Sequence, residues 1–174
     1  MADETTIPPL DPAVDRVRGG AAGRLILEYG DYECPYSRLA FRQIERVERE
    51  LGDGVRFAFR HFPLTRIHPN ALAASLAAEA AAAQGRFWEM HDLLFHRQKA
   101  LEDDDLRGYA GELGLDVARF DADRTGAVAL ERVRRDTAAA AASGLVRGTP
   151  TIFIDGEMYP GDYDAAVLLK LLRA

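Results

Sequence analysis

A strand, helix and strand in succession near the start of the chain constrain its fold most strongly. Residues 24–29 contain a nearly continuous apolar run, which predicts a strand buried on both faces. Residues 35–51 are predicted to form a helix, and residues 55–60 alternate apolar and polar side chains as a second strand does. The buried stripe of the helix is predicted to consist of Leu39, Ile44, Val47 and Leu51. Two strands joined by a helix pair in parallel, so the pattern predicts a βαβ unit.

The middle of the chain has a different pattern. Residues 69–144 are rich in Ala and Leu at helical spacing, with breaks at Gly85, Gly114 and Thr125-Gly126. This segment is predicted to contain three or four helices, inserted between the βαβ unit and the C-terminal elements.

Strand character returns at residues 151–154. The Asp155-Gly156 pair that follows suits a two-residue hairpin into residues 157–159. A last amphipathic helix is expected at about residues 163–172. The fold class is therefore α/β, a small mixed sheet with a helical insertion, in a single domain spanning residues 24–174. Residues 1–23 are polar and are predicted to be a flexible tail.

Composition limits the classes of partner. A chain of 174 residues with 48% hydrophobic residues can bury one core, and its net charge of -6 opposes binding to nucleic acid or to an anionic membrane. Residues 1–23 contain no apolar run of the length that a signal peptide or membrane span needs. One cysteine cannot form an internal disulfide. We therefore expect a cytoplasmic protein, with a mature exported form as the alternative.

Cys34 is the only cysteine, and it lies between the first strand and the helix. Pro35 suits the first helical position, where its missing N–H costs nothing. The free amides of Tyr36 and Ser37 can then point towards the Cys34 sulfur, and a helix N-terminus favours a thiolate, the nucleophilic form.

Other groups around Cys34 modify this expectation. Negative charge on Asp31 and Glu33 opposes a second anion. The Ser37 hydroxyl is a candidate donor to the sulfur, although serine is also common in a first helical turn. A lone cysteine is more often an inert buried thiol. A helix-cap position, a polar flank and an adjacent proline nevertheless favour a reactive one.

The segment Glu-Tyr-Gly-Asp-Tyr-Glu-Cys-Pro-Tyr-Ser at residues 28–37 resembles the active site of the DsbA-like thioredoxin-fold oxidoreductases, whose motif is Cys-Pro-aromatic-Cys after an acidic loop. Residues 148–156 resemble the cis-proline loop of that family and the hairpin after it. Residues 60–64 and 87–91 resemble its cytoplasmic and antiporter-linked branches. The resemblance extends from Arg24 to the C-terminus and implies a thioredoxin-like fold with a helical insertion.

The resemblance also implies roles for individual residues. Cys34 maps to the attacking cysteine, and Pro150 maps to the loop proline with a cis peptide bond. Such a bond places the Thr149 backbone beside the sulfur, where an extended substrate can pair as an added strand. Pro35 and Tyr36 are expected to contribute to the same substrate-binding surface.

Two further positions decide what chemistry is available. Glu28 lies six residues before Cys34, where the family carries a buried acid that assists proton transfer. The alternative is a strand-end side chain turned to solvent. Ser37 stands where the family has its second cysteine, and serine cannot resolve a mixed disulfide. The chain is therefore either a natural monothiol variant or a form whose resolving cysteine has been replaced.

The resulting hypothesis is a thiol-disulfide oxidoreductase of monothiol type, with Cys34, Ser37 and Glu28 as its catalytic residues. It needs no cofactor, uses protein or small-molecule thiols and disulfides as partners, and has glutathione as a candidate co-substrate. One rival is a redox-inactive peptide-binding or chaperone-like module. Another is a glutathione-dependent isomerase or transferase of the kappa-like type, in which serine commonly occupies the position that Cys34 has here.

Other candidates are weaker. The four histidines, at positions 61, 68, 91 and 96, lack the spacing of a zinc site and match no Cys-His peptidase signature. Packing or surface positions are the better interpretation. Phe87, Trp88 and Phe95 are expected in the core rather than in a substrate groove. Residues 102–105 are predicted to be a solvated helix start.

Overall fold

A computed structural model describes residues 7–174 and has a thioredoxin-like α/β fold built on one mixed sheet. In chain order, the elements are β1 (Arg16–Gly19), β2 (Arg24–Gly30), α1 (Pro35–Leu51), the short 3-10 helix η1 (Gly52–Gly54), β3 (Val55–His61), α2 (Ala71–Ala82), α3 (Phe87–His96), α4 (Asp103–Glu112), α5 (Val117–Arg124), α6 (Ala127–Ser143), β4 (Thr151–Ile154), β5 (Glu157–Tyr159) and α7 (Ala165–Arg173). The predicted fold class is confirmed.

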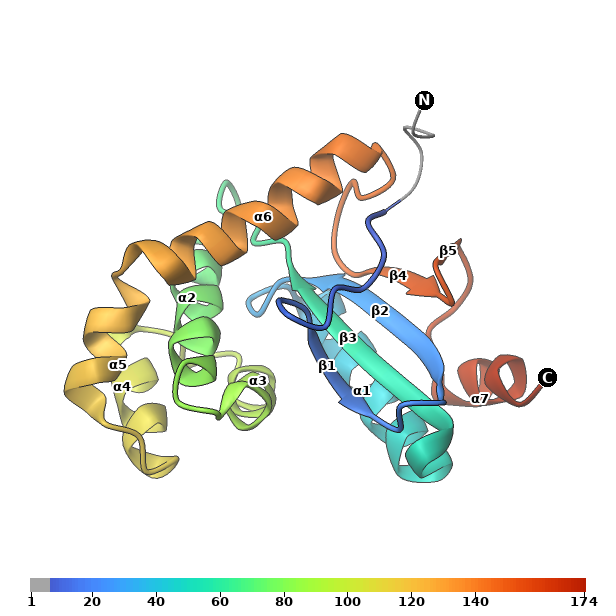
Figure 1. Ribbon diagram of the computed structural model, residues 1–174, viewed down its shortest axis with the longest axis horizontal. Coiled ribbons are helices and arrows are strands. Elements are labelled where there is room, and N and C mark those ends of the chain that lie inside the picture. The colour runs from blue at the N-terminus through green and yellow to red at the C-terminus, as the bar shows by residue number, and fades with distance from the viewer. Residues whose placement is uncertain (1–6) are drawn as a thin grey trace.

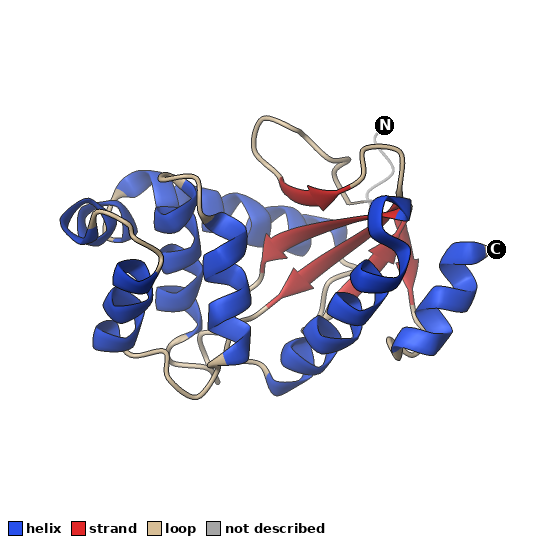
Figure 2. Ribbon diagram, turned by 90° about the horizontal axis from the view of Figure 1, so that it is seen from below, coloured by secondary structure: helices blue, strands red, loops and turns tan. Residues whose placement is uncertain are grey.

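The sheet has the strand order β1-β3-β2-β4-β5. Strands β2 and β3 are parallel, and the other neighbours are antiparallel, so the predicted βαβ unit is confirmed. Helices α1 and α7 cover one face, and the C-terminal end of α6 lies over the other (Figures 1 and 2). Helices α2 to α5 stand together beyond one end of the sheet.

Alternation along β2 assigns its side chains to the two faces. Leu27 and Tyr29 belong to the smaller apolar cluster, with Ala140 of α6. Ile26 belongs to the larger cluster, under α1 and α7. Glu28 is two residues after Ile26, so it points to the same side of the sheet as α1.

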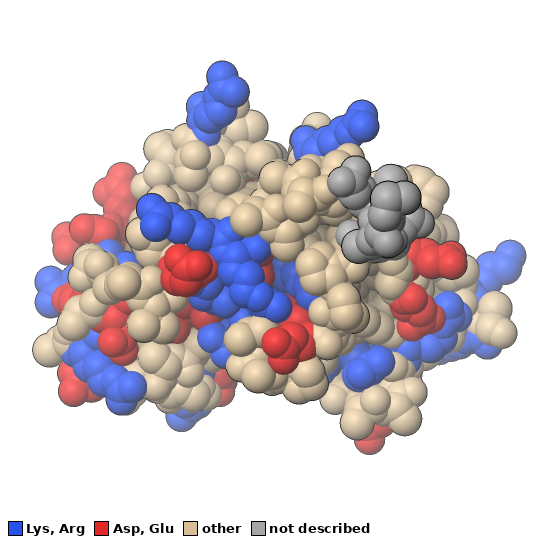
Figure 3. Space-filling view, turned by 45° about the horizontal axis from the view of Figure 1, so that its top comes forward, with Lys and Arg blue, Asp and Glu red and all other residues tan. Residues whose placement is uncertain are grey.

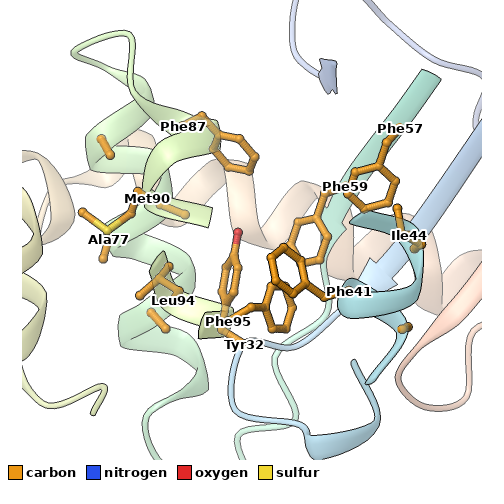
Figure 4. Close-up of a cluster of buried hydrophobic side chains, with 14 of the residues drawn as sticks. Tyr32, Phe41, Ile44, Phe57, Phe59, Ala77, Phe87, Met90, Leu94 and Phe95 are labelled. Atoms are coloured by element: carbon orange, nitrogen blue, oxygen red, sulfur yellow. The ribbon is translucent and has the colours of Figure 1, made fainter. Parts of the chain in front are cut away.

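The larger core joins the sheet to the helical insertion through aromatic rings (Figure 4). The Tyr32 ring lies 5.1 Å from that of Phe59 and 4.9 Å from that of Phe95, and Phe41 stacks on Phe95 at 4.9 Å. Phe87 is also buried, and Trp88 packs against the cluster. The prediction that the aromatic residues of α3 belong to the core is confirmed. The loop before Cys34 is thereby anchored to both parts of the molecule.

The N-terminal segment differs from the predicted flexible tail. Residues 16–19 form β1, an edge strand paired with β3, and Ile7 is buried against the smaller cluster. Arg60 fixes this segment because its guanidinium donates to both carboxylate oxygens of Asp15 and to the carbonyls of Pro8 and Pro9. The part of the predicted tail at residues 1–6 lies outside the described residues.

Two predictions about the helices are corrected. The insertion contains five helices rather than three or four, because the chain also breaks at residues 97–102, which contain no glycine or proline. Leu39 is 48% exposed rather than part of the buried stripe of α1. That face is instead made by Ala40, Phe41, Ile44 and Val47, together with the buried Ser37.

The C-terminal hairpin and the start of α4 follow their predictions. Asp155 and Gly156 have φ of 51° and 91°, which suit the turn between β4 and β5. The Asp155 carboxylate accepts from the Leu25 amide and from Arg24, which ties the turn to β2. Helix α4 begins after Glu102 with a reciprocal capping box to Asp105. Within residues 7–174, no helix combines the length and apolar character needed to cross a bilayer.

Candidate active site

Cys34 is the N-cap residue of α1, with Pro35 at the first helical position. Its backbone is extended, and its side chain makes no capping hydrogen bond. The sulfur instead lies 3.4 Å from the carbonyl oxygen of Thr149, to which the thiol donates. Only 3% of Cys34 is exposed, whereas the adjoining Tyr36 is 62% exposed. The sulfur therefore lies at the base of a rim formed by exposed residues.

The buried carboxylate of Asp31 organises the loop before Cys34. One of its oxygens accepts from the amides of Glu33, at 2.7 Å, and Cys34, at 3.2 Å. The other accepts from the amide of Leu64 and from Nδ1 of His68, both at 2.8 Å. Asp31 therefore fixes the loop that presents the sulfur and joins it to the segment after β3.

The helical insertion holds the same loop from another side. The side-chain amide of Gln98 donates to the carbonyl oxygens of Tyr32 and Cys34, at 2.8 and 2.9 Å. The Glu33 carboxylate accepts from the backbone and side chain of Asn70. The Tyr32 hydroxyl lies 2.9 Å from Nδ1 of the buried His91. These contacts make the geometry of the loop depend on the packing of the insertion.

Glu28 is fully buried, and neither carboxylate oxygen has a hydrogen-bond partner among the described residues. Burial disfavours the charged form and raises the pKa of Glu28 to about 8. The alternative of a solvent-facing side chain is therefore wrong. Burial also raises the pKa of Tyr163, and negative charge on Cys34 and Glu28 adds to that effect.

The Thr149–Pro150 peptide bond is cis, as the resemblance implies. Both residues line an open groove of about 440 Å³ that runs along β4 and β5. Tyr159 and Tyr163 contribute to its walls, and Cys34 does not line it. Thr149 therefore links the Cys34 sulfur to the groove, because its carbonyl accepts from the thiol and it also lines the groove.

Ser37 is buried one turn after Cys34. Its hydroxyl oxygen accepts from the Asp31 amide at 3.2 Å. The hydrogen bond found for the sulfur goes to Thr149 rather than to Ser37. The serine thus has a role in holding the loop, in the position where the resemblance places a resolving cysteine.

From the sequence alone, Asp31 is expected only to oppose a second negative charge, and neither His68 nor Gln98 is expected to support the site. An Asp that caps the amides two and three residues later is a recognisable turn pattern, so Asp31 had a usable signal. His68 and Gln98 had none, because their contacts cross 37 and 64 residues of sequence. Within residues 7–174, no three His, Cys, Asp or Glu side chains gather as metal ligands.

A helix that begins at a cysteine in a βαβ unit, with a cis-proline loop against the sulfur, defines a thioredoxin-type fold and site. The chain belongs to the family of DSBA-like thioredoxin domains, whose model matches residues 25–173.

Among curated proteins, the chain is 45% identical over 168 residues to the Na(+)/H(+) antiporter NhaA of Herminiimonas arsenicoxydans. It is 43% identical over 173 residues to the antiporter NhaA 1 of Mycobacterium sp. (strain KMS). These alignments cover 96% and 98% of this chain but only 26% and 28% of the two relatives. The chain therefore spans about a quarter of the length of the curated relatives it matches.

Among solved structures, a thioredoxin-like oxidoreductase from Silicibacter pomeroyi DSS-3 matches with a TM-score of 0.80 at 25% identity, over 94% of this chain and 92% of that one. BdbD from Bacillus subtilis matches with a TM-score of 0.80 at 19% identity, over 97% and 96% of the two chains. Wolbachia pipientis α-DsbA1 matches with a TM-score of 0.77 at 18% identity, over 95% and 91%. The last two likenesses show the fold.

Proposed function

We propose that this chain is a thiol-disulfide exchange protein that acts through the single thiol of Cys34. The observation that carries the proposal is the position of that thiol, at the cap of α1 and 3.4 Å from the carbonyl of Thr149. An inert structural cysteine needs neither a helix N-terminus nor a cis-proline loop beside it. The first amides of α1 have no side-chain cap and lie at the same end of the helix as the sulfur.

The exchange proceeds in two steps. The Cys34 thiolate attacks one sulfur of a substrate disulfide, so that a mixed disulfide forms and the other substrate sulfur leaves as a thiolate. An external thiol then attacks the mixed disulfide, which returns Cys34 and leaves a new disulfide on the substrate side. Ser37 has no sulfur with which to carry out this second step internally. Glutathione is the co-substrate we propose for it.

Glu28 is proposed to accept and return the proton of the Cys34 thiol. Because the pKa of Glu28 is about 8, a substantial fraction of its carboxyl groups changes charge near neutral pH. It lies on the side of the sheet that α1 covers, and it has no competing hydrogen-bond partner within residues 7–174. Since the Cys34 thiol donates to Thr149 and not to Glu28, a water molecule is proposed to carry the proton between the two groups.

The substrate is proposed to be an extended peptide segment that lies along the groove beside β4 and pairs with the backbone of Thr149. The groove walls provide apolar and aromatic surface, and the exposed Pro35, Tyr36 and Leu39 extend that surface past the sulfur. Such a surface selects for accessible backbone and apolar side chains rather than for one sequence.

The experiment is to follow the transfer of glutathione from a glutathionylated peptide to free glutathione, with C34S as the matched control. The unaltered chain should accelerate the transfer, and the control should not. Equal rates with both proteins would refute the enzymatic proposal. If the peptide alone binds both proteins equally without exchange, the chain is instead a redox-inactive peptide-binding module.

A further inference from the structure

A second cavity lies away from Cys34, between the N-terminal segment and helices α2, α5 and α6. Its volume is about 910 Å³, within the range of small-molecule sites. Six alanines, with Val14, Val128 and Leu130, form the apolar part of its wall, and seven of the other lining residues are charged. Charged side chains reach it from two sides, at Arg16 and Glu79 and along α6.

Arg132 of α6 is the unusual group in this cavity. It is only 8% exposed, and none of its three guanidinium nitrogens has a hydrogen-bond partner among the described residues. Its nearest carboxylate atoms belong to Asp136, at 3.4 Å from Nε, and Asp15, at 3.6 Å from Nη2, and neither contact has hydrogen-bond geometry. The Asp136 oxygen is also without a hydrogen-bond partner among the described residues, whereas Nη1 of Arg132 makes the closest contact with neither carboxylate. Burying a guanidinium without hydrogen bonds is unfavourable in free energy, so an acceptor placed beside this side chain would be stabilised.

The next turn of α6 repeats the pattern. Nη1 of Arg135 is buried without a hydrogen-bond partner, 3.7 Å from Asp15 and 3.8 Å from Asp136. The other arginines nearby are satisfied. Arg60 donates to both oxygens of Asp15, and Arg16 donates to Glu79. The unmet donors are therefore concentrated on the α6 side of the cavity.

The charged side chains at and beside the cavity have a net charge of about +1. Four guanidinium groups, of Arg16, Arg60, Arg132 and Arg135, meet three carboxylates, of Asp15, Glu79 and Asp136. At the rim, the exposed Glu131 and Arg134 offset each other, and Asp123 pairs with Arg119. Basic side chains gather near the middle of this face with acidic ones beside them (Figure 3). One negative charge would balance the group.

The first turn of α6 adds further donors. This 17-residue helix begins after Gly126 without a side-chain cap, and Gly126, Ala127, Val128 and Ala129 line the cavity. The first amides of a helix have no partner within it, and they attract anions. The cavity thus combines the first amides of α6 with two guanidinium groups whose carboxylate contacts, at 3.4 to 3.8 Å, lack hydrogen-bond geometry.

We propose that this cavity binds a small organic carboxylate with an apolar body. The planar carboxylate matches the paired N–H groups of Arg132, and its single charge matches the excess. The alanine-rich wall accepts the apolar body without further polar contacts. A phosphate monoester fits less well, because it carries about two charges at neutral pH and meets an excess of one.

Octanoate is the probe, and its binding to the full chain is measured by isothermal titration calorimetry. The variants are R132M and R135M, with R42M as the matched control because Arg42 is exposed on α1, outside the cavity. Octanoate should bind the unaltered chain and R42M alike, and at least tenfold more weakly to R132M and R135M. Octanol, which lacks the charge, should bind at least tenfold more weakly than octanoate.

Several results would overturn the proposal. They are no octanoate binding by the unaltered chain, equal binding by all four proteins, or octanol binding as tight as octanoate binding. If circular dichroism shows that R132M does not fold, R135M alone decides, since its side chain is half-exposed and its removal leaves Arg132 in place.

Discussion

At the scale of single residues, the proposed site contains a buried acid, Glu28, and a buried thiol, Cys34, with no hydrogen bond between them. Neither oxygen of Glu28 has a hydrogen-bond partner in the described part of the chain, and the Cys34 thiol donates to the carbonyl of Thr149. A neutral carboxyl in this position is tolerated far better than a charged one. The protonation of Glu28 therefore couples the site to the stability of the whole chain.

The stability of the chain should depend on pH through Glu28, and E28Q should remove that dependence. The pKa of Glu28 rises from 4.5 to about 8 on folding. Between these values the native state holds a proton that the unfolded state has released, so stability falls as pH rises through this window. The loss amounts to about 1.4 kcal/mol per pH unit. Glutamine does not titrate, so the free energy of unfolding of E28Q should not fall in this way. Relative to the unaltered chain, E28Q should become more stable by several kcal/mol as the pH rises from 4.5 to about 8.

Urea unfolding at a series of pH values measures this difference. E45Q is the control, because Glu45 is a half-buried carboxylate at the surface of α1. Parallel stability curves for E28Q and the unaltered chain would contradict the burial of a titrating carboxyl at this position.

At the scale of elements, the loop between β2 and α1 is held by side chains from outside it. Asp31 is central, because its carboxylate accepts four hydrogen bonds within a fully buried position. An amide in its place offers only one acceptor oxygen and places an NH₂ group against existing donors.

D31N should therefore lose about 2–3 kcal/mol of unfolding free energy and leave Cys34 less well fixed. Chemical denaturation measures the first effect. The alkylation rate of Cys34 by iodoacetamide measures the second and should change from that of the unaltered chain. D53N, at an exposed aspartate of η1, should change neither quantity. If D31N behaves as D53N does, the loop does not depend on this carboxylate.

The contrast between predicted and missed elements has a physical basis. The β4–β5 hairpin was predictable because Asp155 and Gly156 carry the turn signal locally. Strand β1 was not, because its four residues include one apolar side chain, Val17, and two arginines. Those arginines, Arg16 and Arg18, pair with acids on α1, α2 and α3, and a contact across distant segments leaves no local pattern.

The residues of the candidate site also separate into those that a local sequence pattern predicts and those that it does not. Cys34, Pro35 and the buried Glu28 could be predicted from local pattern and from the family resemblance. The supports at His68 and Gln98 could not, because only the folded insertion brings them to the loop.

At the scale of the whole molecule, the N-terminal segment is part of the domain. Arg60, on β3, is 2% exposed and donates to Asp15, to the Tyr29 hydroxyl and to two backbone carbonyls of the segment. Removing the guanidinium would leave the buried Asp15 carboxylate with the Asp11 amide, which donates to it at 2.7 Å, and with its longer contacts to Arg132 and Arg135.

R60M should therefore lower the unfolding free energy by about 3–5 kcal/mol, the cost of breaking a buried ion pair from one side. Urea denaturation measures it, with R42M as the control for loss of an exposed arginine. Limited proteolysis should also cleave R60M before β1 at a protease dose that spares R42M. An R60M variant as stable as R42M would show that the segment is held by other means.

Cys34 is proposed to be the nucleophile of a thiol-exchange site in which Ser37 cannot carry out the second step internally. Mass spectrometry after incubation with oxidised glutathione, on the unaltered chain and on S37C, tests this proposal most directly. The unaltered chain should gain one glutathionyl group and keep it, whereas S37C should lose that group as an internal disulfide forms. An unaltered chain that gains no glutathionyl group, or an S37C variant that retains it, would contradict the account.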